Sequence, residues 1–307
     1  AEAIFEYKLV KEATSERHLK LHFPKNKHCK ICENAKAMRK PARRRKPVRM
    51  KEAVKFGDIM FADHMLLNSK GEIGAGGERA GLWAFDVATE WRHLGGVCSK
   101  SALDTNVELR EVIGKDVVDK IYSDNSPELR RAIRDLGIVH PRSTPHRSTT
   151  NGSTEANLGV TIAGGRASAL QAGAPHSWWP ISVSSFCNQA NYIGLHAERP
   201  TPHFMRFGEE FKGLTPIHGQ AITYLPPKNV VAALPKFKER TIAGIFLNWY
   251  VLPGGTWHGD YVVAPLAQFT GPVDDKFKLK THRIKEIFLP DVTVFPLAQA
   301  REDVKFL

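Results

Sequence analysis

Three acidic residues lie where their carboxylates could converge. Asp63 lies within an apolar run, Asp124 directly follows another apolar run, and Glu155 follows a polar, turn-rich loop. An acid at the end of a strand and a second acid on a helix one loop later can reach the same point. Converging carboxylates bind hard divalent cations such as Mg²⁺, which prefer oxygen ligands. We therefore expect these three residues to form a metal-dependent catalytic site.

A second set of candidate ligands lies near the N-terminus. The pattern H-x3-H-x6-C-x2-C places there His18, His22, Cys29 and Cys32. Two nitrogen and two sulfur ligands suit tetrahedral, structural Zn²⁺. Histidines four residues apart lie on one face if their segment is helical. His28 is a competing ligand, and the alternative without metal is a pair of surface histidines beside two reduced cysteines.

Positive charge is concentrated in the first sixth of the chain. Residues 1–51 hold 16 Lys and Arg against 5 Asp and Glu, whereas the other 256 residues hold 28 against 27. The segment 36–51 includes two prolines and the basic run Arg43, Arg44, Arg45 and Lys46, which argues against a packed element. Such a linker can bind the phosphate backbone of DNA without reading bases. A nuclear-import signal and a solvated linker without a partner are the alternatives.

Apolar periodicity predicts the elements that would position the acids. A strand at 56–67 carries Asp63, and a strand at 117–122 ends next to Asp124. A helix at 101–115 would connect them by a crossover, so that the two strands run parallel. The apolar face of this helix is expected to consist of Leu103, Val107, Leu109 and Val112. Further strands are expected at 82–87, 93–98 and 138–140, and further helices at 127–136 and 177–193.

The segment that follows Glu155 has weak helix propensity. Gly159, Gly164 and Gly165 each cost a helix about 1 kcal/mol relative to alanine. The preceding loop at 143–152 is rich in Ser, Thr, Pro and Asn, which favour turns. Its His146 and Arg147 could contact substrate phosphates.

The region 208–290 is predicted to be rich in strands and to form a small, SH3-like barrel. Strands are expected near 221–225, 242–249, 260–266 and 273–287. In the last of these, Lys276, Lys278 and Lys280 fall on one strand face. A basic strand face suits contact with a DNA backbone, but lysines also protect exposed edge strands from pairing.

These pieces, in this order, resemble a retrotransposon or retroviral integrase of the DDE type. The matching pieces are the strand around Asp63, GLWAFDVATEW, the SDN at 123–125, STPHRSTTNG, Glu155, GRASALQAG and PHSWWP, which together cover about 56–192. The later stretch FGEEFKG…FKERTIAGIFLNWY is similar to the region that follows the core in long-terminal-repeat retroelement polyproteins. A chain that begins at Ala fits a piece of such a polyprotein.

The resemblance implies a DNA integrase with an RNase H-like catalytic core. Asp63, Asp124 and Glu155 would hold two Mg²⁺ (or Mn²⁺) ions about 4 Å apart. Water would first trim a DNA 3′ end, and the resulting 3′ hydroxyl would then attack a target phosphodiester. The resemblance also implies an N-terminal zinc module, double-stranded DNA as partner (element ends and target), and a homo-oligomer. It implies action in the nucleus after transit through the cytoplasm. Asp86 matches a family position that is not a metal ligand.

Some features depart from the family pattern. The gap between His22 and Cys29 is much shorter than usual, and Ser126 replaces the usual glycine. Leu158 and Gly159 stand where the family has Asn and a basic residue one turn after the glutamate. These departures favour the first alternative, an integrase remnant that binds DNA without cutting it. The second alternative is another RNase H-like nuclease that cuts RNA–DNA hybrids or branched DNA.

The expected organisation is α/β: a mixed sheet with flanking helices, a His/Cys segment and basic linker before it, and a β-rich domain after it. The expected boundaries are 1–35 for the His/Cys segment, 36–52 for the linker, 53–199 for the catalytic core, 200–290 for the β-rich domain and 291–307 for a tail. No apolar run approaches about 18 residues, so no transmembrane helix is expected. There is no signal peptide pattern, and four cysteines with one C-x2-C pair suggest a reducing compartment.

Overall fold

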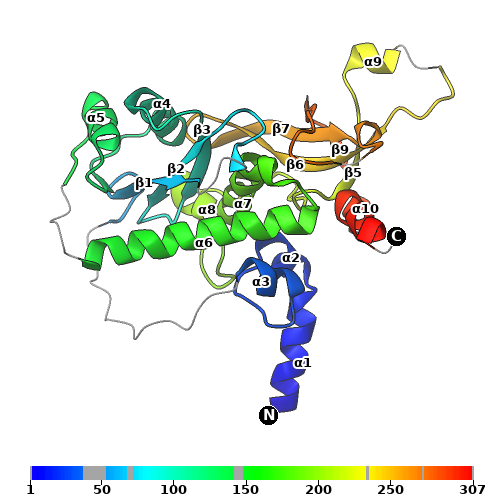
Figure 1. The fold of residues 1–307 in the computed structure, drawn as a ribbon, viewed down its shortest axis with the longest axis horizontal. Coiled ribbons are helices and arrows are strands. Elements are labelled where there is room, and N and C mark those ends of the chain that lie inside the picture. The colour runs from blue at the N-terminus through cyan, green and yellow to red at the C-terminus, as the bar shows by residue number, and fades with distance from the viewer. Residues whose placement is uncertain are drawn as a thin grey trace.

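The computed structural model describes residues 2–36, 53–67, 72–141, 148–232, 235–271 and 273–305 (Figure 1). The predicted DNA-contacting residues Arg43, Arg44, Arg45, Lys46, His146 and Arg147 lie outside the described residues. None of the described helices is both long enough and apolar enough to cross a membrane.

A four-stranded mixed sheet lies at the centre of the first half of the chain. Its strands are β1 (Met60–Leu66), β2 (Ala80–Asp86), β3 (Arg92–Val97) and β4 (Ile121–Ser123), in the order β3-β2-β1-β4. β1 pairs antiparallel with β2, β2 pairs antiparallel with β3, and β1 pairs parallel with β4. The predicted mixed sheet and the predicted parallel crossover are both confirmed.

Helices cover both faces of this sheet, as the alternation of its side chains requires. One face, with Met60 and Ala62 of β1, packs against α4 (Ala102–Ile113) and α5 (Pro127–Asp135). The other face, with Phe61 of β1, packs against α7 (Trp179–Ile193) and α6 (Ser148–Ala172). Both faces are therefore buried, which explains why β2 has no exposed residue.

The buried face of α4 differs from the predicted one. Leu103 and Val107 are 72% and 51% exposed, whereas the buried residues of the helix are Thr105, Leu109, Val112 and Ile113. Thr105 belongs to this face because its hydroxyl bonds His64 Nε2 (3.0 Å) from the sheet. A polar side chain with a buried partner thus shifts the core-facing stripe by a fraction of a turn.

The glycines of α6 make a close helix–helix contact possible. α6 begins at Ser148, inside the segment predicted as a loop, and runs for 25 residues. A Cβ on Gly164 would lie 2.2 Å from the ring of Phe186, and one on Gly165 would lie 2.1 Å from Cγ2 of Val183. Any larger residue would push α7 away, so the weak helix propensity of this segment is linked to tight packing.

The second half of the chain contains a five-stranded antiparallel sheet in the order β8-β7-β6-β5-β9. The strands and helices here are α8 (Pro202–Phe207), β5 (Ala221–Tyr224), α9 (Lys228–Ala232), β6 (Ile242–Leu252), β7 (Thr256–Pro265), η3 (Leu266–Gln268), β8 (His282–Ile284) and β9 (Ile287–Phe288). Aromatic residues from this sheet and from α7 form a shared core, in which Tyr192 stacks on Phe211 with ring centroids 3.8 Å apart. The predicted β-rich region is confirmed, and it packs directly on the first half.

The predicted strand over 273–287 is wrong for most of its length, because only its last residues pair, in β8 and β9. Lys276, Lys278 and Lys280 nevertheless alternate outward, while Phe277 and Leu279 pack inward. The backbone of Lys280 bonds the side chain of Gln268 through its N–H (2.9 Å) and its C=O (3.0 Å). The alternation was correct, but a side-chain amide takes the place of a neighbouring strand.

Both ends of the described chain pack on α6. The segment expected as a tail contains α10 (Pro296–Lys305), whose Leu297 is buried and whose Arg301 donates to Ala174 C=O (3.3 Å). The N-terminal segment forms α1 (Glu2–Ala13), α2 (Glu16–Leu21) and α3 (Lys30–Ala35). Figure 1 shows α2 and α3 beneath α6 and α10 beside its C-terminal end. The short helix η2 (His176–Trp178) leads into α7, and Trp178 is a buried core residue.

Candidate active site and metal centre

The strand directions gather polar side chains at one edge of the first sheet. β1, β3 and β4 all run the same way, so their C-terminal ends lie at the same edge. The last pair between β1 and β4 is Ala62 with Ser123, which places Asp63 and Asp124 next to each other at the following position. Ends of parallel strands are a common location for catalytic groups in α/β folds.

Glu155 reaches the same edge from α6. The indole Nε1–H of Trp83, the β2 partner of Asp63, donates to Thr161 Oγ1 of α6 at 3.1 Å and so fixes the helix beside the sheet. Burial raises the pKa of Asp63 above its usual range, and the negative charges of Asp124 and Glu155 raise it further. Asp124 and Glu155 are thus close enough to Asp63 for their charges to act on it.

Local hydrogen bonds orient the two aspartates. Asp63 Oδ1 accepts from the backbone N–H of His64 (2.8 Å), and Asp124 Oδ1 accepts from the N–H of Ser126 (3.2 Å). The Ser126 hydroxyl accepts from Leu129 N–H (3.4 Å) and caps α5. At the position where glycine was expected, the serine therefore starts a helix without displacing Asp124.

Lys100 is a candidate site residue that the sequence interpretation missed. It follows β3, and its charge lowers the pKa of Asp63 and contributes to the lowered pKa of the buried His64 imidazole. Its position follows from the topology, because the end of β3 lies at the same edge as the ends of β1 and β4. The signal in the sequence was a lysine directly after the third strand, which becomes meaningful only once the strand order is known.

The exposed surface of α6 around Glu155 carries no basic side chain. Leu158 turns inward and packs against the sheet, and Gly159 faces open space, where an added Cβ would meet no atom within 4 Å. The one basic residue of α6, Arg166, instead donates to the backbone of Ala35 (2.9 Å). Any contact of this chain with phosphates near the acids must therefore come from other elements.

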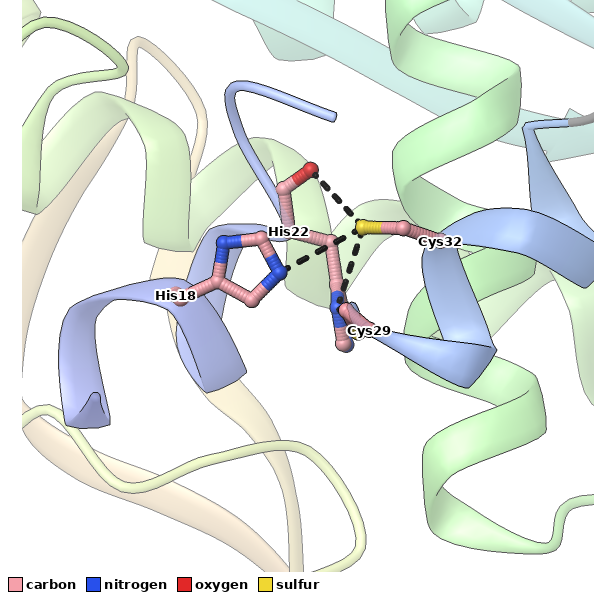
Figure 2. A group of neighbouring side chains, drawn as sticks. All are labelled: His18, His22, Cys29 and Cys32. Carbon is pink, nitrogen blue, oxygen red and sulfur yellow. Dashed lines mark hydrogen bonds between the residues drawn. The ribbon is translucent and has the colours of Figure 1, made fainter. Parts of the chain in front are cut away.

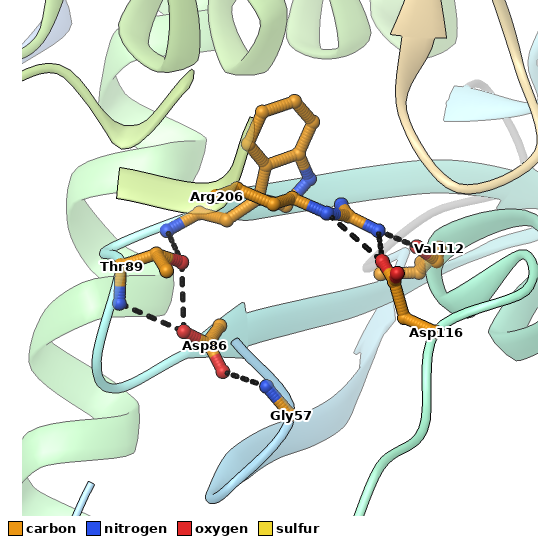
Figure 3. A network of polar contacts seen from close by, with 7 residues as sticks. Gly57, Asp86, Thr89, Val112, Asp116 and Arg206 are labelled. Carbon is orange, nitrogen blue, oxygen red and sulfur yellow. Dashed lines mark hydrogen bonds and ion pairs between the residues drawn. The ribbon is translucent and has the colours of Figure 1, made fainter. Parts of the chain in front are cut away.

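Asp86, the rival acid of the second strand, has a structural role (Figure 3). Its buried carboxylate accepts from Gly57 N–H (2.9 Å), Thr89 N–H (2.8 Å) and the Thr89 hydroxyl (2.7 Å). Burial raises the pKa of Asp86, while these donors lower it. The expectation that Asp86 is not a metal ligand agrees with this set of partners, which holds the turn between β2 and β3.

The four N-terminal candidates form a compact buried cluster (Figure 2). Cys32 Sγ lies 3.4 Å from His18 Nε2, and Cys29 Sγ lies 3.5 Å from His22 Nδ1. The four ligand atoms all lie within 4.8 Å of one another, and no other group of three or more potential ligands in the described parts of the chain is gathered so closely. These separations fit a tetrahedral site with Zn–S bonds of about 2.3 Å and Zn–N bonds of about 2.0 Å.

The electrostatics of this cluster suit a metal. Burial and the neighbouring His18 lower the pKa of His22 to about 4, so its imidazole is neutral and able to act as a ligand. Burial raises the pKa of Cys32, and the ammonium of Lys36 lowers it. His28, the competing ligand, is instead paired with Glu6 at 2.9 Å and lies outside the cluster.

The His/Cys segment is fixed to the rest of the protein through backbone carbonyls. Gln171 of α6 donates to Leu19 C=O (2.9 Å), and Arg17 donates to Gly194 C=O after α7 (2.7 Å). With the Arg166 contact, these bonds join the segment to the same helix that carries Glu155. The His/Cys segment therefore packs against α6 and the end of α7.

No protein-family model and no curated protein match the chain. Among solved structures, the catalytic core domain of BIV integrase matches with 15% identity and a TM-score of 0.37, over 50% of this chain and 95% of that chain. A simian T-cell lymphotropic virus intasome, determined in complex with the PP2A regulatory subunit B56 gamma, matches with 12% identity and a TM-score of 0.43, over 82% of this chain and 85% of that chain. Because these identities and TM-scores are so low, a function for this chain has to be argued from its own residues.

Proposed function

We propose that this chain is a metal-dependent DNA-joining enzyme of the integrase type. The observation that supports the proposal is that Asp63 and Asp124 follow the last paired residues of two parallel strands, and that the charge of Glu155 acts on Asp63 from helix α6. A buried carboxyl whose pKa is raised by two neighbouring acids is unfavourable in its charged form unless a cation lies beside it. An oxygen-only donor set of this kind fits Mg²⁺ or Mn²⁺ and no soft metal.

In this proposal, each residue at the sheet edge has a defined role. Asp63, Asp124 and Glu155 would hold two divalent ions, and the ions would supply activation of the attacking water or 3′ hydroxyl and stabilisation of the leaving oxygen. The backbone N–H groups of His64 and Ser126 hold the carboxylates of Asp63 and Asp124 in place. Lys100 lies close enough to Asp63 to attract a DNA phosphate to the same edge.

The His/Cys cluster would hold one structural Zn²⁺ through His18, His22, Cys29 and Cys32. The buried Nδ1 of His18 and Nε2 of His22 have no hydrogen-bond partner, and the carbonyl oxygen of Gln171, on α6, also lacks one. A zinc-bound imidazole usually donates its other N–H to such an oxygen. Zinc would thereby stabilise the position of α6.

The remaining contacts with DNA are assigned to basic groups away from α6. They include Arg43, Arg44, Arg45 and Lys46 of the linker, His146 and Arg147 before α6, and the outward Lys276, Lys278 and Lys280. We assign double-stranded DNA as the partner, a homo-oligomer as the working form and the nucleus as the place of action. An SH3-like arrangement of the C-terminal sheet and a retroelement polyprotein as the source belong to the same proposal.

A strand-transfer assay tests the proposal. Purified protein is incubated with a labelled duplex that mimics a retroelement end, with Mg²⁺ and Mn²⁺ in parallel. Joined products should form with the wild type and with the exposed-acid control Glu239→Gln, and should disappear with Glu155→Gln. The proposal fails if products form equally with Glu155→Gln.

A DNA-binding remnant without activity is the second candidate function. The observation that favours it is the absence of a basic side chain at Leu158 and Gly159 beside the acids. Salt-sensitive DNA binding without joining by the wild type would support it. Gly159→Lys would then be expected to increase DNA affinity, because this position faces open space on the exposed surface of α6 near Glu155. Cleavage of an RNA–DNA hybrid would instead indicate another RNase H-like nuclease.

A further inference from the structure

A polar cavity lies between the edge strand β3, helix α7 and strand β6. Its volume is about 240 Å³, and its polar lining includes Arg92, His93, Ser184, Asn188 and Asn248. Arg92 is two strands away from Asp63 in the sheet order, so the cavity is separate from the acidic site. It lies where the C-terminal sheet meets the first half of the chain.

Arg92 is the unusual residue of this cavity. Arg92 is one of the residues that line the cavity, it is only 3% exposed, and its Nε and Nη1 atoms have no hydrogen-bond partner. In the described parts of the chain, no carboxylate lies within 4.0 Å of its guanidinium. The carboxylate of Glu90 is bonded to Arg199 instead, at 2.9 Å.

Other neighbours do not neutralise this charge. Burial raises the pKa of the adjacent Cys187 thiol to about 12, so the sulfur is uncharged at neutral pH. The Phe85 ring lies 5.3 Å from the guanidinium carbon, which gives a weak cation–π contact at most. Glu111 lines the cavity as well, but it is an exposed residue and forms no ion pair with Arg92.

The backbone of Arg92 is held in place by hydrogen bonds to α7. The side chain of Asn191 accepts from the Arg92 N–H (3.0 Å) and donates to the Arg92 C=O (2.9 Å). Asn188 donates to Asn248 Oδ1 (2.9 Å), and Asn248 donates to Ser184 Oγ (3.1 Å). Because Ser184 accepts in this chain, its own hydroxyl proton is free to point into the cavity.

A buried charge is normally paired, because taking it out of water without a partner is unfavourable. A buried guanidinium with free N–H groups beside a polar cavity is therefore suited to bind an anion. Its planar fork of donors suits the oxygens of a phosphate group. The volume admits one phosphate group, so a larger substituent such as a nucleoside or the rest of a DNA end would have to lie outside the cavity.

We propose that this cavity binds a single phosphate group, held by Arg92 and Ser184. A bound phosphate would stabilise the contact between β3, α7 and β6 and so join the two halves of the chain. The site does not depend on the proposed metal chemistry. The phosphate can come from a free ion or a small phosphate monoester, or from one phosphodiester of a bound DNA end.

Thermal unfolding of the full chain in phosphate- and sulfate-free buffer is the first test. Inorganic phosphate or adenosine monophosphate should raise the Tm of the wild type and of the exposed-arginine control Arg79→Met, but not that of Arg92→Met. Titration calorimetry should show binding weakened by about 10- to 100-fold in Arg92→Met, as expected when one charge-assisted hydrogen bond is lost. Without phosphate, Arg92→Met should unfold at a higher temperature than the wild type, because an unpaired buried charge has been removed. Equal phosphate responses in the wild type and in Arg92→Met would overturn the proposal.

A second variant keeps the test decisive if Arg92→Met does not fold. Asn188→Asp places a carboxylate in the same cavity, so it should abolish the response to phosphate by repelling the anion. An undiminished phosphate response in Asn188→Asp would refute the site.

The source of the phosphate is distinguished by DNA binding at several salt concentrations. A salt dependence of DNA affinity that is weaker in Arg92→Met, by the amount expected for about one phosphate contact, supports a site for a DNA phosphodiester. An unchanged salt dependence, together with a lost response to inorganic phosphate, supports a site for the free ion or monoester.

Discussion

Two glycine substitutions in α6 provide a direct test of how this helix packs. Gly165→Ala would place a Cβ 2.1 Å from Val183 Cγ2, whereas Gly159→Ala would place one in open space. Carbon atoms in contact lie about 3.5–4.0 Å apart, so α7 would have to move by more than about 1 Å in the first variant. Both changes gain the same helix propensity of about 1 kcal/mol.

The free energies of unfolding of the two variants should therefore differ only by the cost of overpacking at Gly165. Inserting one methyl group into a packed contact costs about 1–3 kcal/mol. Gly159→Ala should raise the free energy of unfolding by up to about 1 kcal/mol, and Gly165→Ala should leave it unchanged or lower it by up to about 2 kcal/mol. At roughly 2–4 °C per kcal/mol for a chain of this size, the gap in Tm is about 2–12 °C.

The assay is thermal unfolding of the purified chain, followed by circular dichroism under one buffer condition. The wild type is measured alongside, and each variant is checked for the same helix content at low temperature. Equal increases in Tm for Gly159→Ala and Gly165→Ala would refute the reasoning, because they would show that α6 and α7 are not in close contact at Gly165.

Three further outcomes are expected. The folded-state pKa of Asp63 is raised, so its favourable contribution to stability is present at low pH and is lost as pH rises through that pKa. Asp63→Asn should therefore raise the Tm at neutral pH in Mg²⁺-free buffer, and an unchanged Tm would contradict the convergence of acids. Native mass spectrometry should find one zinc per chain, lost in Cys32→Ser together with a lower Tm, and retained in His28→Ala because His28 lies outside the cluster. Arg206 stacks 3.6 Å above the Phe56 ring and bonds Asp116 (2.7 Å), and the bond to Asp116 is drawn in Figure 3. Arg206→Ala should therefore lower the free energy of unfolding by about 2–3 kcal/mol in denaturant titrations, and a loss below about 0.5 kcal/mol would argue against this network.

The local pattern of the sequence was sufficient to predict most of the first sheet. The alternation around Asp63 and the apolar run before Asp124 predicted β1 and β4, and the connecting helix predicted their parallel pairing. These features follow from local rules, because side-chain alternation and crossover connections are fixed by backbone geometry. The candidate acids could be chosen from the sequence for the same reason, although their roles remain a proposal.

Predictions that depended on a distant partner were less accurate. The buried face of α4 could not be read from its apolar residues, because Thr105 is buried through a bond to His64 on β1. The predicted strand over 273–287 was wrong for most of its length, and at Lys280 the backbone bonds the side chain of Gln268 in place of a neighbouring strand. Alternation shows which side chains point outward, but it does not show what the backbone bonds to.

The sequence by itself determined which residue types are available for chemistry: three acids that follow apolar runs, and two histidines and two cysteines at ligand spacing. Only the tertiary structure decided which of them meet. In the structure His28 lies outside the ligand cluster, Lys100 lies close enough to Asp63 to act on it, and the buried Arg92 has no hydrogen-bond partner for its Nε and Nη1 atoms. The physical reason is that hydrogen bonding, burial and charge repulsion act between residues far apart in the chain, and spacing along the sequence carries no measure of those distances.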